Sequence, residues 1–168
     1  RLTRPVVATD FSPSILRRDR VRLEHFGLYD RVSLVAFGAR LTPFKDRAVK
    51  TMTSNVGLSN IREPGTLLEE LRRIIDGRFL SICHFFDEED EANAEAIREL
   101  RLESLYRSAT MKAFTDAGWK VEAANTVSAR AEPTPRSTLL GAGIDGLPVT
   151  ETVLEFCVLV AEGCDATN

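Results

Sequence analysis

The order of short apolar runs and helical patterns is the feature that most constrains this fold. Runs rich in Val, Leu and Phe alternate with segments whose apolar residues recur every three or four positions. The apolar runs cover residues 5–9, 31–37, 48–55 and 78–86, and the helical patterns cover 13–26, 67–75 and 92–117. Strands that alternate with helices usually form a parallel sheet, because parallel neighbours need a crossover connection. The sequence therefore predicts an α/β fold with a mostly parallel sheet.

The first strand and helix have clear boundaries. The apolar run that begins at Pro5 ends at Asp10, which suits a buried parallel strand. Ser12 and Pro13 then supply an N-cap and a first-turn proline, and Gly27 is a natural helix stop.

The second half of the chain changes character. Asp76-Gly77 is expected to end the helix over 67–75, and one long helix is expected from Ala92 to Ala117, closed by Gly118. Two further strands, 119–123 and 152–160, are joined by a loop rich in Pro, Gly and Ser instead of a helix. We therefore expect an antiparallel C-terminal strand and a single domain over residues 1–168, since no interdomain linker is evident.

Composition excludes several classes of protein. The 168 residues carry a net charge of −3 with mixed signs, which is not the basic stripe of a nucleic-acid binder. No apolar stretch approaches the length of a membrane span. Cys83, Cys157 and Cys164 are an odd, widely spaced set, which favours a reducing, cytoplasmic setting over a disulfide framework. With only His25 and His84, a His-rich metal site is not expected.

Asp10 is the first candidate for a functional role. It follows the first strand directly, and ligands of open α/β sheets collect at the carboxyl ends of strands. A carboxylate there can accept hydrogen bonds from both hydroxyls of a ribose. The alternative is an aspartate that caps the helix or closes the turn, and position alone favours that alternative.

The wider pattern resembles the class I S-adenosylmethionine-dependent methyltransferases. The segments that carry the resemblance follow the family's order along nearly the whole chain: Val6–Leu16, Phe37–Phe44, Ala48–Leu58, Leu68–Leu80 and the Gly118-Trp119 turn with the terminal strand pair. The resemblance implies a three-layer, Rossmann-like methyltransferase sheet, mostly parallel, with an antiparallel C-terminal strand. It also implies S-adenosylmethionine as the cofactor.

The resemblance places cofactor contacts at the ends of three strands. They are Asp10 at the ribose, Phe11, Gly38 and Ala39 at the adenine, and Ser54 and Asn55 near the methionine part. Two positions depart from the family pattern, which usually has an acid where Gly38 stands and commonly an Asp where Lys50 stands. Loss of one charge-assisted hydrogen bond costs about 1.5–3 kcal/mol, so cofactor binding would be weakened.

The family's first strand and its glycine-rich turn should lie upstream of Arg1. Without them the sheet would be left as two groups of strands with bare edges. We therefore expect either a fragment that is truncated at its N-terminus or an unusual packing of the chain. Gly141–Gly146 spells G-x-G-x-x-G, but Pro148 and a strand follow it, so a glycine-rich connection is expected there instead of a phosphate-binding turn.

Other reactive side chains have simpler explanations. His84 is a weak candidate for a general base, and a histidine packed within a strand is the favoured interpretation. Cys83 is expected to be a small core residue. The acidic stretch Asp87–Glu91 lacks the spacing of a calcium loop and is expected to open a helix. No metal site is predicted.

The resemblance implies transfer of the sulfonium methyl group to a small-molecule acceptor, with no nucleic-acid or membrane partner. Two alternatives remain open. One is a methyltransferase-like module without catalysis, which the missing glycine motif, Gly38 and Lys50 favour. The other is an NAD-binding or nucleotide-binding Rossmann protein, which also places an acid after its second strand. The terminal strand pair counts against this second alternative.

Overall fold

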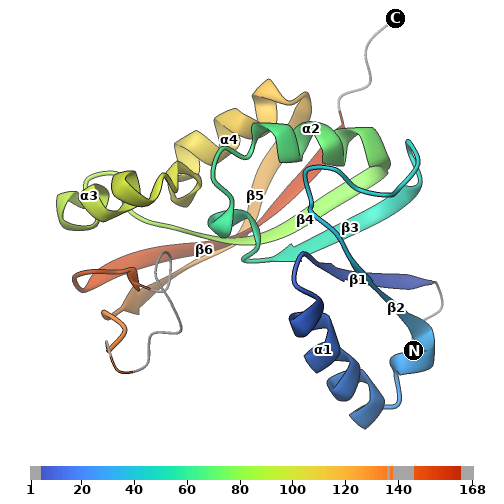
Figure 1. The fold of residues 1–168 in the computed structure, drawn as a ribbon. Helices are drawn as coiled ribbons and strands as arrows, with labels where there is room; N and C mark the ends of the chain where they lie inside the picture. Colours follow the sequence, from blue (N-terminus) through green and yellow to red (C-terminus); the bar gives the residue numbers. More distant parts are fainter. Residues whose placement is uncertain (1–4, 136, 138–145, 164–168) are drawn as a thin grey trace, which may run out of the picture. The chain divides into compact units, whose positions relative to one another are not determined.

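The structure, a computed structural model, describes residues 5–135, 137 and 146–163. The chain forms two units, Arg1–Phe44 and Lys45–Asn168 (Figure 1). Their strands belong to two separate sheets, one of two strands and one of four. The expectation of two strand groups is thus confirmed, whereas the single domain stays a prediction.

The first unit is a β-α-β arrangement. Its elements are β1 (Val6–Asp10), α1 (Pro13–His25), the short 3₁₀ helix η1 (Tyr29–Arg31) and β2 (Val32–Ala36). β1 and β2 are parallel, in register from Val6 opposite Val32 to Asp10 opposite Ala36. Both strands and the helix lie where the sequence predicts them.

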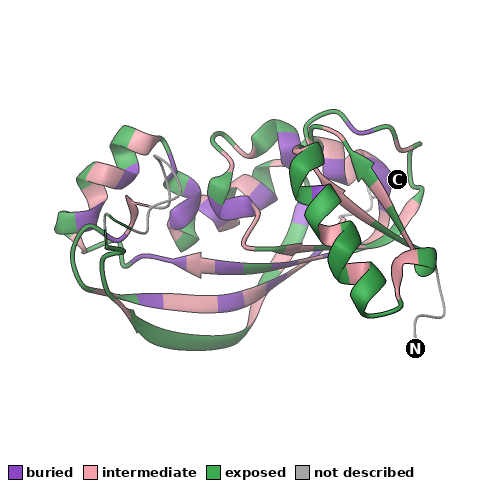
Figure 2. Cartoon of the chain, turned by 60° about the horizontal axis from the view of Figure 1, so that its bottom comes forward, coloured by how far each residue is buried: buried purple, intermediate pink, exposed green. Residues whose placement is uncertain are grey.

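The prediction that the first strand is buried is wrong. Val6 and Val7 are 36% and 43% exposed. β1 is paired with one strand only, and within residues 5–44 the one buried apolar side chain is that of Leu16. Most of the surface of α1 is correspondingly exposed (Figure 2). An apolar run becomes a buried strand only when neighbours cover both of its faces.

The second unit is a four-stranded sheet with helices. Its strands are β3 (Val49–Asn55), β4 (Ile75–Phe85), β5 (Trp119–Ala131) and β6 (Thr152–Gly163), in the spatial order β3-β4-β6-β5. Its helices are α2 (Gly65–Ile74), α3 (Glu91–Leu100) and α4 (Arg107–Asp116), with the 3₁₀ turns η2 (Leu58–Asn60) and η3 (Glu103–Leu105). β3 is parallel to β4, and β6 is antiparallel to both of its neighbours. The α/β class and the antiparallel C-terminal strand are as predicted.

The core of this unit lies between its helices and one face of the sheet (Figure 1). The rings of Phe79, Phe114 and Trp119 contact one another, with centroids 6.0–6.4 Å apart. The Trp119 indole N–H also donates to the backbone oxygen of Leu68 in α2, at 3.0 Å. β4, α2, α4 and β5 are therefore held together by one cluster.

The boundary between α2 and β4 differs from the prediction. Asp76-Gly77 does not end the helix but lies inside β4, which begins at Ile75 directly after α2. Ile75 pairs with Val49, and an added Cβ at Gly77 would lie 2.1 Å from the backbone oxygen of Lys50. The glycine is therefore required by the close approach of β3, and the sheet pairing overrides its usual role as a helix stop.

The predicted long helix is also wrong, because it is divided into α3, η3 and α4. Arg101 adopts a left-handed conformation (φ 56°) and ends α3. The side chains of Leu102 and Leu105, which follow, are buried in one cluster with Phe86 and Ile97. Burial of these side chains favours the break over a continuous helix, whereas Gly118 (φ 78°) closes the region as predicted.

β5 extends well beyond the predicted strand 119–123. Asn125 has a positive φ of 53°, and the register with β6 shifts between Ala124 and Val127. This is the geometry of a β-bulge, after which pairing continues to Ala131 opposite Thr152.

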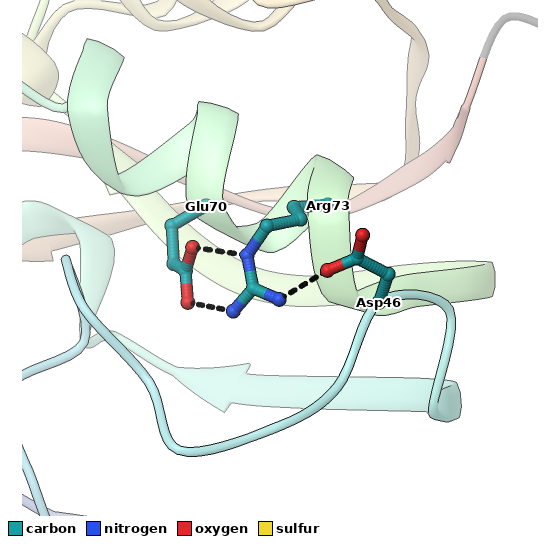
Figure 3. Close-up of polar contacts among 3 residues, drawn as sticks. All are labelled: Asp46, Glu70 and Arg73. Atoms are coloured by element: carbon teal, nitrogen blue, oxygen red, sulfur yellow. Dashed lines mark hydrogen bonds and ion pairs between the residues drawn. The ribbon is translucent and has the colours of Figure 1, made fainter.

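Ion pairs tie the start of the second unit to α2. Arg73 binds Glu70 through two hydrogen bonds of 2.8 and 2.6 Å and binds Asp46 through one of 2.5 Å (Figure 3). The hydrogen bonds that Arg73 donates to Glu70, and then to Asp46, raise the pKa of Arg73. Asp46 precedes β3, so this group helps to fix where that strand begins.

Candidate functional site

Asp10 lies where the carboxyl ends of β1 and β2 meet. Its backbone oxygen accepts from the Phe37 amide at 3.2 Å, so the segments that leave both strands run side by side. Its carboxylate Oδ1 accepts from the Ser12 amide at 2.7 Å. Asp10 therefore closes the turn after β1, as the alternative interpretation expects. Its other carboxylate oxygen, Oδ2, has no hydrogen-bond partner within the described ranges.

The other candidate residues of the first unit lie at the same end of this strand pair. Phe11 follows β1 with 82% of its surface exposed. Gly38 and Ala39 follow β2, and the Gly38 oxygen accepts from the Leu41 amide at 3.1 Å, which closes a tight turn. The structure thus brings Asp10, Phe11, Gly38 and Ala39 together, as the sequence predicts.

Ser54 and Asn55 end β3 in the second unit. They pair with Ser81 and Ile82 of β4, and alternate residues of a strand point to opposite faces. Ser54 is half-buried and Asn55 is exposed. Assignment of both residues to the cofactor stays a prediction.

Lys50, one of the two departures from the family pattern, lies at the other end of β3. It forms an ion pair with Asp76, which also binds Arg47. The hydrogen bond from Lys50, followed by the charge of Arg47, lowers the pKa of Asp76. Lys50 is four residues from Ser54, roughly 13 Å along an extended strand. Its charge therefore pairs with Asp76 at the start of β3, away from the candidate cofactor residues at the other end.

His84 is packed within β4. It lies opposite Phe156 of β6, with ring centroids 5.9 Å apart, and 6.4 Å from the ring of Phe86. Burial lowers the pKa of His84, so the imidazole is neutral near pH 7. His84 is thus packed within a strand, which is the interpretation that the sequence favours. A role as general base stays a prediction.

Cys83 and Cys157 are free thiols that lie opposite each other on β4 and β6, both buried. Burial raises the pKa of Cys83 to about 11, and it also raises that of Cys157. Cys83 is therefore a protonated core residue, as predicted. Cys164 lies outside the described residues.

The acidic stretch opens α3 as predicted, through one specific residue. Asp90 accepts hydrogen bonds from the Asn93 amide at 3.2 Å, the Asn93 side chain at 2.7 Å and the Thr152 hydroxyl at 2.6 Å. The carbonyl of buried Asn93 in turn accepts from the Val149 amide at 2.7 Å. Across residues 5–135, 137 and 146–163, no group of acidic, His or Cys side chains is arranged to hold a metal ion.

A pocket of about 320 Å³ lies at the carboxyl end of β4, and sequence reasoning did not anticipate it. Its lining residues come from four elements and the β4–α3 turn: Phe85, Phe86, Asp87, Glu88, Arg107, Ser128, Val153 and Glu155. Arg107 binds Glu155 across it at 2.9 Å. The Phe-Phe-Asp-Glu run marks the strand end in the sequence, but Arg107 of α4, Ser128 of β5 and Glu155 of β6 join it from distant parts of the chain.

The glycine-rich segment Gly141–Gly146 lies outside the described residues except for Gly146. None of the helices in the described ranges combines the length and apolar character needed to cross a membrane.

Comparison with known proteins identifies relatives. Residues 2–89 match the model of the ubiE/COQ5 methyltransferase family. A demethylmenaquinone methyltransferase from Clavibacter sepedonicus is 40% identical over 81 residues, a stretch that covers 48% of this chain and 32% of that relative. The matched stretch thus spans about a third of the length of the curated relative.

Solved structures extend the similarity to nearly the whole chain. The YcgJ protein of Bacillus subtilis has a TM-score of 0.75 at 13% identity, over 96% of this chain and 83% of its own. A geranyl diphosphate C-methyltransferase from Streptomyces coelicolor A3(2), solved in complex with Mg²⁺, geranyl diphosphate and S-adenosyl-L-homocysteine, has a TM-score of 0.61 at 16% identity, over 94% of this chain and 63% of its own. At these identities the likeness establishes a common fold.

Proposed function

Because the chain belongs to the ubiE/COQ5 methyltransferase family, we propose that it binds S-adenosylmethionine and takes part in methyl transfer to a small molecule. The family match over residues 2–89 carries this proposal, since it includes every candidate cofactor residue from Asp10 to Asn55. A structural neighbour that was solved with S-adenosyl-L-homocysteine supports the same cofactor.

Asp10 is the residue we assign to the ribose. Oδ1 already accepts from the Ser12 amide, but a carboxylate oxygen has two lone pairs and Oδ2 is unoccupied within the described residues. The turn therefore fixes the carboxylate while it leaves capacity for two hydroxyl donors. Phe11, exposed beside it, would cover one face of the adenine.

For the acceptor we propose the pocket at the carboxyl end of β4. Phe85 and Phe86 supply apolar walls and the Arg107–Glu155 pair supplies polar groups, a combination that orients a small organic molecule. The relative from Clavibacter sepedonicus is a demethylmenaquinone methyltransferase, so demethylmenaquinone is the first acceptor to test.

Calorimetric titration with S-adenosylhomocysteine tests the cofactor assignment. Asp10→Asn keeps an oxygen that can accept from the Ser12 amide but removes the charge, so affinity should fall by roughly 10-fold or more while the fold is retained. Asp30→Asn, an exposed acid in η1 of the same unit, is the matched control and should bind like the original chain.

Two results would contradict the proposal. A chain that is folded by circular dichroism and shows no saturable heat with S-adenosylhomocysteine would refute cofactor binding. Binding of NAD in its place would support the nucleotide-binding alternative.

A further inference from the structure

The turn after β3 contains an unusual backbone conformation. Val56 has a φ of 57°, a left-handed conformation that β-branched residues rarely adopt. Its amide donates to the Ile82 oxygen at 2.9 Å, and the next residues, Leu58 and Ser59, are buried. These contacts on both sides hold the strained residue in place, and strain of this kind is concentrated at functional sites.

Gly57 lies directly against the Ser54 side chain as a result of this turn. A Cβ added at Gly57 would lie 2.6 Å from Ser54 Oγ but 4.0 Å from Ser54 Cβ. Gly57 itself has ordinary right-handed angles, φ −69° and ψ −35°, which any residue adopts. Glycine is therefore needed here only for the space that the Ser54 hydroxyl occupies.

The Ser54 hydroxyl is available to a ligand. In the part of the chain that the structure describes, Ser54 Oγ has no hydrogen-bond partner, and the side chain is half-buried at the carboxyl end of β3. Ligands of α/β sheets bind at this end of the strands.

We propose that Gly57 is a positioning residue because, having no Cβ, it leaves room for the Ser54 hydroxyl in the orientation that hydrogen-bonds the methionine part of the cofactor. Val56, through its left-handed conformation, places Gly57 against Ser54. This inference rests on the proposed function, because it takes S-adenosylmethionine as the ligand that Ser54 meets.

A double-mutant cycle tests it. Affinity for S-adenosylhomocysteine is measured by calorimetry for the original chain, Ser54→Ala, Gly57→Ala and the double variant. Loss of one neutral hydrogen bond predicts an affinity about 3-fold to 10-fold lower for Ser54→Ala. Gly57→Ala should cause a similar loss by displacing the hydroxyl, and the double variant should be no weaker than Ser54→Ala alone.

Gly65→Ala is the matched control. Gly65 begins α2 in the same unit, and a Cβ added there meets no atom within 4 Å. This variant should bind S-adenosylhomocysteine like the original chain.

Thermal unfolding of the same variants without ligand tests the contact independently of binding. Gly57→Ala should lower the midpoint when Ser54 is present, and should leave it unchanged or raise it in the Ser54→Ala background, where the clash is removed. Additive midpoint shifts, or additive losses of affinity, would overturn the inference.

Binding failures of two kinds are distinguishable. If the folded original chain binds no S-adenosylhomocysteine, the proposed function fails, and the assignment of a cofactor to Ser54 fails with it. If the original chain binds and Ser54→Ala binds equally well, only the present inference is refuted.

Discussion

The same local motif occurs once in each unit of the molecule, with very different burial. β1-α1-β2 and β3-α2-β4 are both parallel strand pairs connected through a helix. α1 buries only Leu16, whereas α2 buries four apolar side chains, Leu67, Leu68, Leu71 and Ile74. The difference lies in what surrounds each motif, since β4 is also paired with β6 and α2 also packs near α4 and Trp119.

This difference has an energetic consequence. Burial of a Leu or Ile side chain contributes about 1.5–3 kcal/mol relative to its exposure. α2 therefore gains several times more from packing than α1 does. Alternating strands and helices thus specify the motif, while neighbouring elements determine how stable it is.

The largest expected effect distinguishes two phenylalanines. Phe114 of α4 is fully buried against Phe79 and Trp119, so Phe114→Ala should lower the free energy of unfolding by about 3–5 kcal/mol. Phe11 of the first unit is 82% exposed, and Phe11→Ala should change it by less than about 0.5 kcal/mol. Urea unfolding followed by circular dichroism measures both. Similar costs for the two variants would show that the first unit is packed as well as the second.

Hydrogen exchange compares the two strand pairs directly. Amides of β4 and β6, within the four-stranded sheet, should exchange through near-global unfolding. Amides of β1 and β2 should exchange through local opening, with protection lower by about two orders of magnitude or more. Mass spectrometry of peptic peptides from each pair gives the ratio. Equal protection in both pairs would contradict the comparison.

The sequence predicts the order of elements better than their boundaries. Pro13 at the first helical position and Gly118 mark helix ends through local chemistry, so those ends could be predicted, although the predicted Ser12 side-chain cap is not formed. Ile75–Gly77 joins β4 because β3 pairs with it, and the helix breaks at Arg101 because Leu102 enters the core. These choices depend on partners distant in the sequence, which local patterns do not contain.

The candidate site divides in the same way. The position of Asp10 at a strand end follows from the sequence, and so does the proximity of Gly38 in the adjacent strand turn. The contact between Gly57 and Ser54 does not, because it depends on the left-handed conformation of Val56. The buried position of Asn93 could not be predicted from the sequence either, since its distant partners, Val149 and Thr150, lie in the residues just before β6.

A smaller effect should reveal how α3 is anchored. Partial burial raises the pKa of Asp90, but hydrogen bonds from Thr152, the Asn93 side chain and the backbone outweigh it, so the pKa is lowered overall. A depressed pKa stabilises the fold above the unfolded value of about 3.9, and this stabilisation is lost as pH falls through the folded value. Asp90→Asn keeps one oxygen that can cap the helix but replaces the charged Oδ2, which accepts from the Asn93 side chain and Thr152, by an amide that cannot accept. It should therefore cost about 1–2 kcal/mol near pH 7 and progressively less below about pH 4.

Urea unfolding at a series of pH values measures this difference. Asp116→Asn, which removes an exposed carboxylate from the end of α4, is the control and should show a small effect at every pH. A cost of Asp90→Asn that does not change between pH 7 and pH 3 would mean that its charge contributes nothing to the cap.

The smallest expected effect concerns the N-cap of α1. Ser12 occupies the cap position, but its hydroxyl bonds the Ser14 hydroxyl at 2.7 Å and caps no helix amide. Asp90 at the corresponding position of α3 does cap, through the Asn93 amide. Ser12→Ala should therefore cost less than about 0.5 kcal/mol, against about 1–2 kcal/mol for Asp90→Ala, in the same urea experiment. A cost of about 1–2 kcal/mol at Ser12 would mean that its hydroxyl accepts from a helix amide in solution. The first unit would then be more stable than its exposed strands imply.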